Sequence, residues 1–201
     1  MGRGCSRRLS RSPMDAIALL KQDHREVQKL FRSFRGAGVR ASETSGALAA
    51  KIVTELSRHS AIEEEVLYPT LRELFPDDES EEFVLEALEE HHVAKSMLAE
   101  IDRLSPQDER FRAKVMVLID SVEQHVAEEE RTVLPELRRA LSRQRLNELG
   151  DALASAKRRA PTRPHPHAPD EPPALPLVGA ASAVVDRARD ISEEAIRRLT
   201  G

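Results

Sequence analysis

The chain has 201 residues, of which 33% are charged, 40% are hydrophobic and 3% are aromatic. This composition is typical of helices rather than sheets, and the length indicates one domain with extensions or two small ones. The single cysteine, Cys5, excludes an intramolecular disulfide framework and a cysteine-based zinc site. The absence of an 18-residue apolar run and the net charge of −4 predict a cytoplasmic protein with no membrane span and no nucleic-acid partner.

Four regions of the chain differ in composition. Residues 1–13 are basic and predicted to be disordered, and Met14 is an alternative first residue of the protein. Residues 14–158 are periodic and apolar enough to fold. Residues 159–176 hold seven of the twelve prolines and are predicted to form an extended linker. Residues 177–201 are predicted to form an amphipathic helix or a disordered tail, which is the candidate contact for a protein partner.

Four long helices with short connections are predicted in the folding region. The first begins at the Ser12-Pro13 cap and ends at Gly36-Ala37-Gly38. The second ends near Phe75-Pro76-Asp77 and the third near Leu104-Ser105-Pro106, and a short fifth helix over residues 142–158 follows the fourth and lies against the bundle end. Short connections make sequential helices antiparallel neighbours. The predicted fold is therefore all-α, an up-down-up-down four-helix bundle with a short fifth helix and a proline-rich C-terminal extension.

Each of the four apolar stripes is interrupted by one histidine, and two of these histidines have a glutamate four residues later on the same helix face. The six residues are His24, His59, Glu63, His91, His125 and Glu129. In a bundle they converge in the interior, where each buried polar group costs several kcal/mol unless something compensates it. Imidazole and carboxylate ligands without thiolate suit iron, manganese or zinc. The pattern therefore predicts a pair of metal ions bridged by the two carboxylates.

An internal repeat supports this prediction. The segments His59–Pro69 and His125–Pro135 both have glutamates four and five residues after the histidine and a proline ten residues after it. Pro69 and Pro135 are expected to bend or end their helices just beyond the candidate ligands. The second and fourth helices are therefore pseudo-equivalent, as a nearly symmetric dinuclear site requires.

These segments resemble the hemerythrin family, specifically the bacterial hemerythrin-like (HHE cation-binding) proteins. The resemblance covers residues 14 to about 142, and the matching segments are Leu20-Lys-Gln-Asp-His24, His59-x-x-x-Glu63-Glu64 with Leu67-Tyr-Pro69, Glu90-His91, and His125-x-x-x-Glu129-Glu130 with Leu134-Pro135. It implies a non-haem, oxo- or hydroxo-bridged centre of two iron ions in a four-helix bundle. Carried over residue by residue, it makes the same six side chains the iron ligands.

The chain departs from the oxygen-carrying hemerythrins at two positions. Those carriers have a second histidine on the third helix, one turn after the first, where this chain has Lys95. Their last carboxylate is an aspartate five residues after the fourth-helix histidine, whereas Glu129 follows at four. With fewer histidine ligands, an open metal position favours exchange with water, oxygen or peroxide over simple oxygen carriage.

Several residues have an alternative interpretation. His92 competes with His91 for the ligand position on the third helix, although His91 shares the stripe of apolar residues. Asp23 and Glu55 are either carboxylates that orient imidazoles or solvated helix charges. The pair His165 and His167 is ordinary linker composition or a loose metal site.

Three functional hypotheses follow. The first is a di-iron protein, monomeric or weakly self-associating, that binds a diatomic or peroxide ligand and decomposes hydrogen peroxide in a catalase-like reaction or senses redox state under oxidative stress. The second is a non-catalytic iron-binding or iron-sensing module, and the third is a metal-free helical interaction protein. The residues alone do not separate iron from manganese or zinc.

Overall fold

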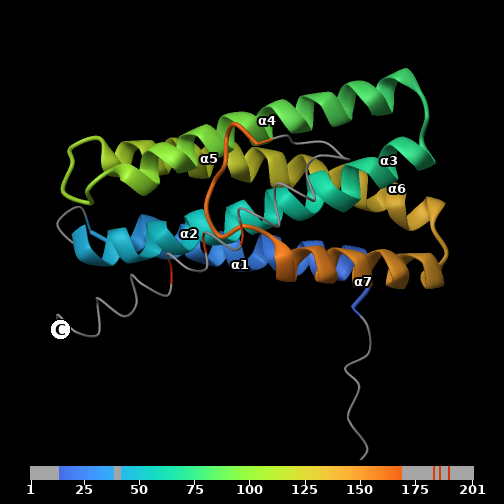
Figure 1. The fold of residues 1–201 in the computed structure, drawn as a ribbon, viewed down its shortest axis with the longest axis horizontal. Coiled ribbons are helices and arrows are strands. Elements are labelled where there is room, and N and C mark those ends of the chain that lie inside the picture. Colours follow the sequence, from blue (N-terminus) through green and yellow to red (C-terminus); the bar gives the residue numbers. More distant parts are fainter. Residues whose placement is uncertain (1–13, 39–41, 169–182, 184–185, 187–189, 191–201) are drawn as a thin grey trace, which may run out of the picture.

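The computed structural model of the chain describes residues 14–38 and 42–168, together with Ala183, Asp186 and Asp190. Every element in the described part is a helix (Figure 1). In chain order they are α1 (Ala16–Gly36), α2 (Ser42–Ile62), the π-helical segment η1 (Glu63–Leu67), α3 (Tyr68–Leu74), α4 (Asp78–Arg103), α5 (Phe111–Arg131), α6 (Val133–Ala140) and α7 (Arg143–Arg159). No helix among the described residues is long and apolar enough to cross a membrane.

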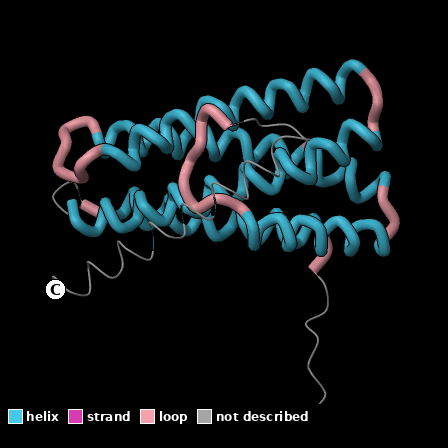
Figure 2. The backbone as a smooth tube through the Cα atoms, viewed as in Figure 1, coloured by secondary structure: helices cyan, strands magenta, loops and turns pink. Residues whose placement is uncertain are grey.

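The four long helices run side by side along the long axis of the molecule (Figure 2). Helix α1 packs against α2 and α5, and α4 packs against the same two helices, so that the four form a closed ring. The segments η1 and α3 continue α2, while α6 continues α5. This arrangement confirms the predicted all-α bundle.

The first helix begins later than the sequence predicted. Its N-cap is Asp15, whose carboxylate accepts a hydrogen bond of 2.8 Å from the backbone N–H of Ala18. The predicted cap at Ser12-Pro13 lies outside the described residues. The Asp15 carboxylate pairs with a backbone N–H that has no partner within the helix. It is therefore a stronger start signal for this helix than Pro13.

Both repeated prolines follow an interruption of a long helix, as predicted. A proline ring clashes with the carbonyl four residues earlier, which belongs to Glu65 for Pro69 and to Arg131 for Pro135. The first carbonyl lies in the π-helical segment η1, and the second belongs to the last residue of α5. The first interruption therefore begins at the candidate ligand Glu63, and the second follows Glu129, so that both precede the proline of their repeat.

The candidate ligands lie in a polar layer between two separate hydrophobic clusters. The first cluster includes Leu20 and residues of α3, α6 and α7, whereas the second includes Val27 and residues of α2 and α5. On α1, His24 lies between these two leucine and valine positions. Helices α2 and α4 also pass from one cluster to the other near their own histidines, and α5 lies in the second cluster while its continuation α6 lies in the first. The apolar core is thus divided at the level of the four histidines.

Helix α7 lies along the bundle rather than against its end, which corrects the sequence prediction. It contacts α1, α2 and η1, and in Figure 1 it runs beside α1. Lys157 Nζ lies 2.6 Å from Asp23 Oδ1, and Arg159 donates to Glu65 in η1. The buried residues Leu146, Leu149 and Leu153 give α7 an apolar face, and this face explains why it packs lengthwise.

The first residues of the predicted linker contact the bundle. Arg163 donates two hydrogen bonds, of 2.8 and 2.9 Å, to the carboxylate of Asp102 on α4. The backbone N–H groups of Thr162 and Arg163 each donate to Asp186 Oδ2 at 3.0 Å. Apart from Ala183, Asp186 and Asp190, the predicted C-terminal helix lies outside the described residues.

Gly150 provides a test of how α7 packs. A Cβ atom at this position would lie 2.2 Å from the carbonyl oxygen of Met14 and 2.9 Å from the backbone nitrogen of Ala16. Since both atoms belong to the backbone, neither can rotate away, and we expect Gly150→Ala to lower the free energy of unfolding by about 1–3 kcal/mol. Urea unfolding measures this change. The control is Gly36→Ala, because no atom lies within 4 Å of a Cβ there; equal stability of the two variants would contradict the close packing.

Candidate metal centre

The structure brings all six predicted ligands together, although they come from four different helices and from η1. Their ligand atoms fall into two overlapping groups, and within each group all the atoms lie within 4.8 Å of one another. One group contains His24, His59, Glu63 and Glu129, and the other contains Glu63, His91 and His125. Glu63 belongs to both groups. This overlap is the geometry expected of two ions joined by a carboxylate.

Each of the two carboxylates lies between an imidazole of the first group and an imidazole of the second. Glu63 Oε1 lies 3.2 Å from His59 Nε2, while its other oxygen lies 3.4 Å from His91 Nε2. Glu129 Oε2 lies 3.4 Å from His24 Nε2 and 3.9 Å from His125 Nε2. Each glutamate therefore contacts one histidine of each group. The two oxygens of Glu63 face different groups, as in a bridging ligand.

Two further glutamates hold the outer nitrogens of two imidazoles. Glu64 Oε1 lies 3.0 Å from His91 Nδ1, and Glu130 Oε1 lies 2.9 Å from His24 Nδ1. Because a carboxylate only accepts hydrogen bonds, each of these imidazoles carries its proton on Nδ1 and presents a lone pair at Nε2. In both copies of the repeat, the first glutamate faces the inner nitrogen of a histidine on a neighbouring helix and the second glutamate binds its outer nitrogen.

A third carboxylate orients His125. Its Nδ1 donates to Glu90 Oε2 over 2.6 Å, so its Nε2 also faces the interior. Such outer carboxylates fix the tautomer and orientation of a ligating imidazole, and their loss lowers metal affinity by about 10- to 100-fold. Three of the four histidines are therefore held in the tautomer that leaves Nε2 free for a cation.

The two inner carboxyls are both buried, yet their pKa values shift in opposite directions. Burial, reinforced by the nearby charge of Glu129, raises the pKa of Glu63 well above its usual value. Burial also opposes ionisation of Glu129, but the imidazoles of His24 and His125, whose Nε2 atoms lie 3.4 and 3.9 Å from its carboxylate, outweigh burial and lower its pKa. In the metal-free protein, Glu63 thus holds a proton at pH values where an exposed glutamate has lost it.

The imidazole nitrogens and carboxylate oxygens of the layer are better placed to bind a cation than to hydrogen-bond with one another. Both side-chain oxygens of Glu63 and of Glu129 are buried and make no hydrogen bond, and the same holds for Nε2 of His24 and His59. The Nε2 atoms of His91 and His125 lie 3.3 Å apart, although both imidazoles donate from Nδ1. Two lone pairs at this distance repel each other unless a proton or a metal ion lies between them. The residues present therefore fit a pair of metal ions with nitrogen and oxygen ligands.

The position held by a second histidine in the oxygen carriers has a different role in this chain. Lys95 is buried, and its ammonium group lies 3.0 Å from both oxygens of Glu64. It therefore supports the carboxylate that orients His91 instead of entering the ligand layer. Tyr68 supplies an oxygen atom there, because its hydroxyl lies 3.1 Å from His91 Nε2 and the residue is 1% exposed. Tyr68 is thus a further candidate donor on the His91 side.

The alternatives left by the sequence are resolved by burial and contacts. His92 is exposed, whereas His91 is buried in the layer. Asp23 receives a hydrogen bond from Lys157, and Glu55 lies 3.7 Å from Arg58 on its own helix. Neither carboxylate contacts an imidazole nitrogen among the described residues, so of the two interpretations that the sequence left open the contacts do not support the orienting role.

His165 also lies away from the layer. Its Nε2 is 3.2 Å from Asp186 Oδ2, at the C-terminal contact with the bundle. His167 belongs to no metal-ligand group among the described residues. The linker histidines therefore do not extend the metal centre.

The sequence contained a signal for the outer glutamates that the prediction did not use. Glu64 and Glu130 each lie five residues after the repeated histidine, so the repeat conserves two glutamates where the predicted ligand set needs only one. Glu90 directly precedes His91 and Tyr68 directly precedes Pro69, and the sequence pattern of neither residue distinguishes it from an ordinary helix residue.

Known proteins are similar to this chain in sequence and fold. The family model described as the hemerythrin HHE cation-binding domain matches residues 15–137. An uncharacterized hemerythrin-like protein of Schizosaccharomyces pombe is 30% identical over 173 residues, which cover 86% of this chain and 84% of that protein. A DNA nickase of Nostoc sp. is 28% identical over 146 residues, but these cover 72% of this chain and only 39% of the nickase. The crystal structure of a hemerythrin HHE cation-binding domain-containing protein from Mycobacterium kansasii has a TM-score of 0.60 at 25% identity, covering 72% of this chain and 85% of that one.

The raised pKa of Glu63 predicts how the metal-free protein responds to pH. Below the usual glutamate pKa, the folded and unfolded states both hold the proton; as the pH rises toward the raised pKa, only the folded state still holds it. The free energy of unfolding therefore falls with rising pH by at most about 1.4 kcal/mol per pH unit from this group. The metal-free Glu63→Gln variant lacks this titratable group, so we expect its free energy of unfolding to fall less than that of the wild type as the pH rises. Urea unfolding at about pH 5 and about pH 8 measures the difference.

Added metal should make the wild type more stable than Glu63→Gln at the higher pH. Because a cation displaces the proton of Glu63, we expect added metal to stabilise the wild type more at the higher pH and to stabilise Glu63→Gln little. Glu73→Gln, at an exposed position on α3, is the control and should follow the wild type. Parallel pH dependences of the wild type and Glu63→Gln would show that Glu63 is not the buried acid.

Proposed function

The chain belongs to the hemerythrin family of HHE cation-binding domains, and we propose that its polar layer holds two iron ions that bind oxygen or peroxide. The observation that carries this proposal is the pair of buried ligand groups sharing Glu63. One ion would be held by His24, His59, Glu63 and Glu129. The other would be held by Glu63, His91 and His125, with the hydroxyl of Tyr68 beside His91.

The donor set supports a metal centre whose ligands stay fixed while a small molecule exchanges. When bound, a pair of iron ions supplies an exchangeable ligand position and a two-electron change shared between the two metals. Glu64, Glu90 and Glu130 hold three imidazoles in the ligating tautomer, and this preorganisation keeps the sites ready without rearrangement. The two hydrophobic clusters above and below the layer exclude bulk water from the metals.

We propose peroxide decomposition as the reaction of this centre. Two molecules of hydrogen peroxide give two of water and one of dioxygen, so one peroxide supplies the two electrons that the other accepts and no external reductant is needed. The protons that move in this exchange need a donor inside the buried layer. The hydroxyl of Tyr68, 3.1 Å from His91 Nε2, is positioned to hold and return one.

Iron loading and peroxide turnover test the proposal together. We expect protein produced with iron to carry about two iron ions per chain, as carboxylate and histidine sites in helical bundles do, and to show a near-ultraviolet absorption that changes when peroxide is added. Replacing both His59 and His125 by alanine removes one ligand from each group, so we expect the iron content, the absorption and oxygen release to be lost together. Metal analysis and an oxygen electrode measure these outcomes.

His92→Ala is the matched control, because this histidine is adjacent to a candidate ligand but is exposed. It should keep the iron content and turnover of the wild type. Zinc as the sole metal in protein from its native host, or an iron-loaded protein that neither changes its spectrum nor releases oxygen with peroxide, would contradict the proposed reaction.

A second candidate function, an iron sensor, is favoured by the contact between α7 and the ligand segment. Arg159 donates to Glu65, which lies two residues after the shared ligand Glu63, and Lys157 binds Asp23 beside His24. Metal binding would fix His24 and Glu63, which adjoin the residues that α7 contacts. In this function, occupancy of the site is transmitted to α7 and to the residues that follow it.

Hydrogen exchange distinguishes the sensor from a simple binding site. We expect iron to slow amide exchange in α7 as well as in the four ligand-bearing helices, and Lys157→Ala to weaken the effect in α7 alone. Equal exchange of α7 with and without iron, in a protein whose ligand helices are protected, would remove the sensor function while leaving the metal centre intact.

A further inference from the structure

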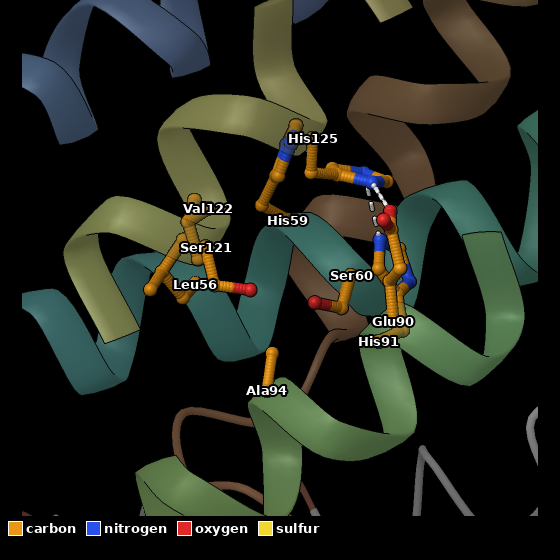
Figure 3. Close-up of a pocket in the computed structure, with 9 residues that line it drawn as sticks. All are labelled: Leu56, His59, Ser60, Glu90, His91, Ala94, Ser121, Val122 and His125. Atoms are coloured by element: carbon orange, nitrogen blue, oxygen red, sulfur yellow. Dashed lines mark hydrogen bonds and ion pairs between the residues drawn. The ribbon is translucent and has the colours of Figure 1, made fainter. Parts of the chain in front are cut away.

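A second polar cluster lies where the chain leaves α7. The cavity drawn in Figure 3 is lined by His59, His91 and His125 and belongs to the metal centre, whereas this second cluster shares no residue with the centre. Residues 160–168, the orange segment that follows α7 in Figure 1, run from α7 to α4, where Arg163 binds both oxygens of Asp102. Since α2 contacts both α7 and α4, the segment bridges two neighbours of α2.

Hydrogen-bond donors of this segment converge on two carboxylates from the C-terminal part of the chain. The backbone N–H groups of Thr162 and Arg163 each donate to Asp186 Oδ2 at 3.0 Å, and His165 Nε2 lies 3.2 Å from the same oxygen. The Thr162 hydroxyl donates to Asp190 Oδ2 over 2.8 Å, and the Arg163 guanidinium donates to Asp190 Oδ1 over 3.3 Å. The segment therefore surrounds the two carboxylates with backbone, hydroxyl and charged donors, as anion-binding sites do.

Burial distinguishes this cluster from an ordinary surface ion pair. Asp186 and Thr162 are each 3% exposed, and the nearby Ala183 is 1% exposed. An exposed ion pair contributes little to stability, because water solvates both of its members. A buried carboxylate, in contrast, is costly unless hydrogen-bond donors satisfy it. Asp186 therefore depends on the donors of residues 162–165.

The two aspartates share one face of a helix with Ala183. All three residues are helical, and spacings of three and four residues place side chains on the same helix face. The ligand that residues 162–165 bind is thus a helix that carries two carboxylates one turn apart, with a small apolar residue one turn before them.

We propose that residues 162–165 form a binding site for such a helix and that the helix carrying Asp186 and Asp190 occupies it within the same chain. The C-terminal extension is then a strap closed against the bundle instead of a free contact for another protein. Thr162, Arg163 and His165 lie outside residues 15–137, which the family model matches, so membership of the family does not imply the strap. The strap does not depend on a metal ion.

The connection between site and ligand favours closure within one chain. Asp186 follows Arg163 by 23 residues. A short tether keeps its ligand at an effective concentration on the order of millimolar, so a modest affinity is sufficient to close the strap. At micromolar protein concentration, the helix of a second copy competes poorly with the tethered one.

Hydrogen exchange at Thr162 and Arg163 tests the strap in the full-length protein. Prolines alternate through residues 160–168 and have no N–H, so a peptide of this segment reports on few amides besides these two. We expect Asp186→Ala, which removes the acceptor of both amides, to speed their exchange by about tenfold or more. Mass spectrometry after peptic digestion measures the rates.

Asp190→Ala separates binding of the helix from a single local contact. Among the described residues, Asp190 accepts hydrogen bonds only from the side chains of Thr162 and Arg163. Faster exchange of the two backbone amides in this variant, which we expect to be about threefold or more, therefore reports release of the helix as a unit. Asp151→Ala, at an exposed position on α7, is the control and should keep the wild-type rates. The metal content should be the same in all three variants.

Three results would overturn the strap. The first is exchange of the wild-type amides of Thr162 and Arg163 at the rate of an unstructured peptide, or at a rate that Asp186→Ala leaves unchanged. The second is faster exchange in Asp186→Ala but not in Asp190→Ala, which would reduce the site to one local contact. The third is protection that is lost on dilution, together with a dimer in analytical ultracentrifugation, which would place the helix on a second copy of the chain.

Discussion

The structure depends on a single electrostatic constraint, which is the burial of Glu63 and Glu129 in one layer. Each carboxylate is at most 1% exposed, and their oxygens make no hydrogen bond. Neither protonation of Glu63 nor the charge of His24 compensates the whole layer, because the inner nitrogens of His91 and His125 also oppose each other. Two cations would pair with the carboxylates and the imidazole lone pairs together. Because apolar clusters lie on both sides, leaving any of these groups unpaired costs several kcal/mol.

The local backbone serves this layer. Regular α-helical spacing would place adjacent residues about 100° apart, yet Glu63 and Glu64 are both buried and contact opposite sides of the His91 ring. In the first repeat, Glu63 and Glu64 begin the wider π-helical turn of η1, and such turns are frequent at functional sites. Pro69 then prevents a return to uninterrupted hydrogen bonding at Glu65 and keeps the turn in place. In the second repeat, Glu129 and Glu130 lie in the last turn of α5, and the helix is interrupted after them, at Thr132.

Hydrophobic periodicity was sufficient to predict the bundle and the side chains that enter the layer, and the positions of glycine and proline predicted where the long helices end. It assigns each residue to a face of its own helix, and His24 or His125 therefore stood out as polar residues on apolar faces. The pairing across helices could not be predicted in this way, because the contact of Glu130 with His24 depends on how two distant helices dock. The same limit explains why the contact of Tyr68 with His91 was not predicted and why the role of Asp23, which pairs with Lys157, stayed open.

The repeat and the asymmetry of the site have different physical origins. Each copy of the His-x-x-x-Glu-Glu segment supplies one histidine, one inner carboxylate and one outer carboxylate, and this equivalence alone would give two equal metal sites. Helix α7 lies on only one side of the bundle, however, where Lys157 and Arg159 pair with carboxylates next to the ligands. Lys95 changes the other side by engaging Glu64 without providing a ligand. A nearly symmetric ligand set therefore lies in asymmetric surroundings, with α7 and its two cations on one side and the Lys95–Glu64 pair on the other.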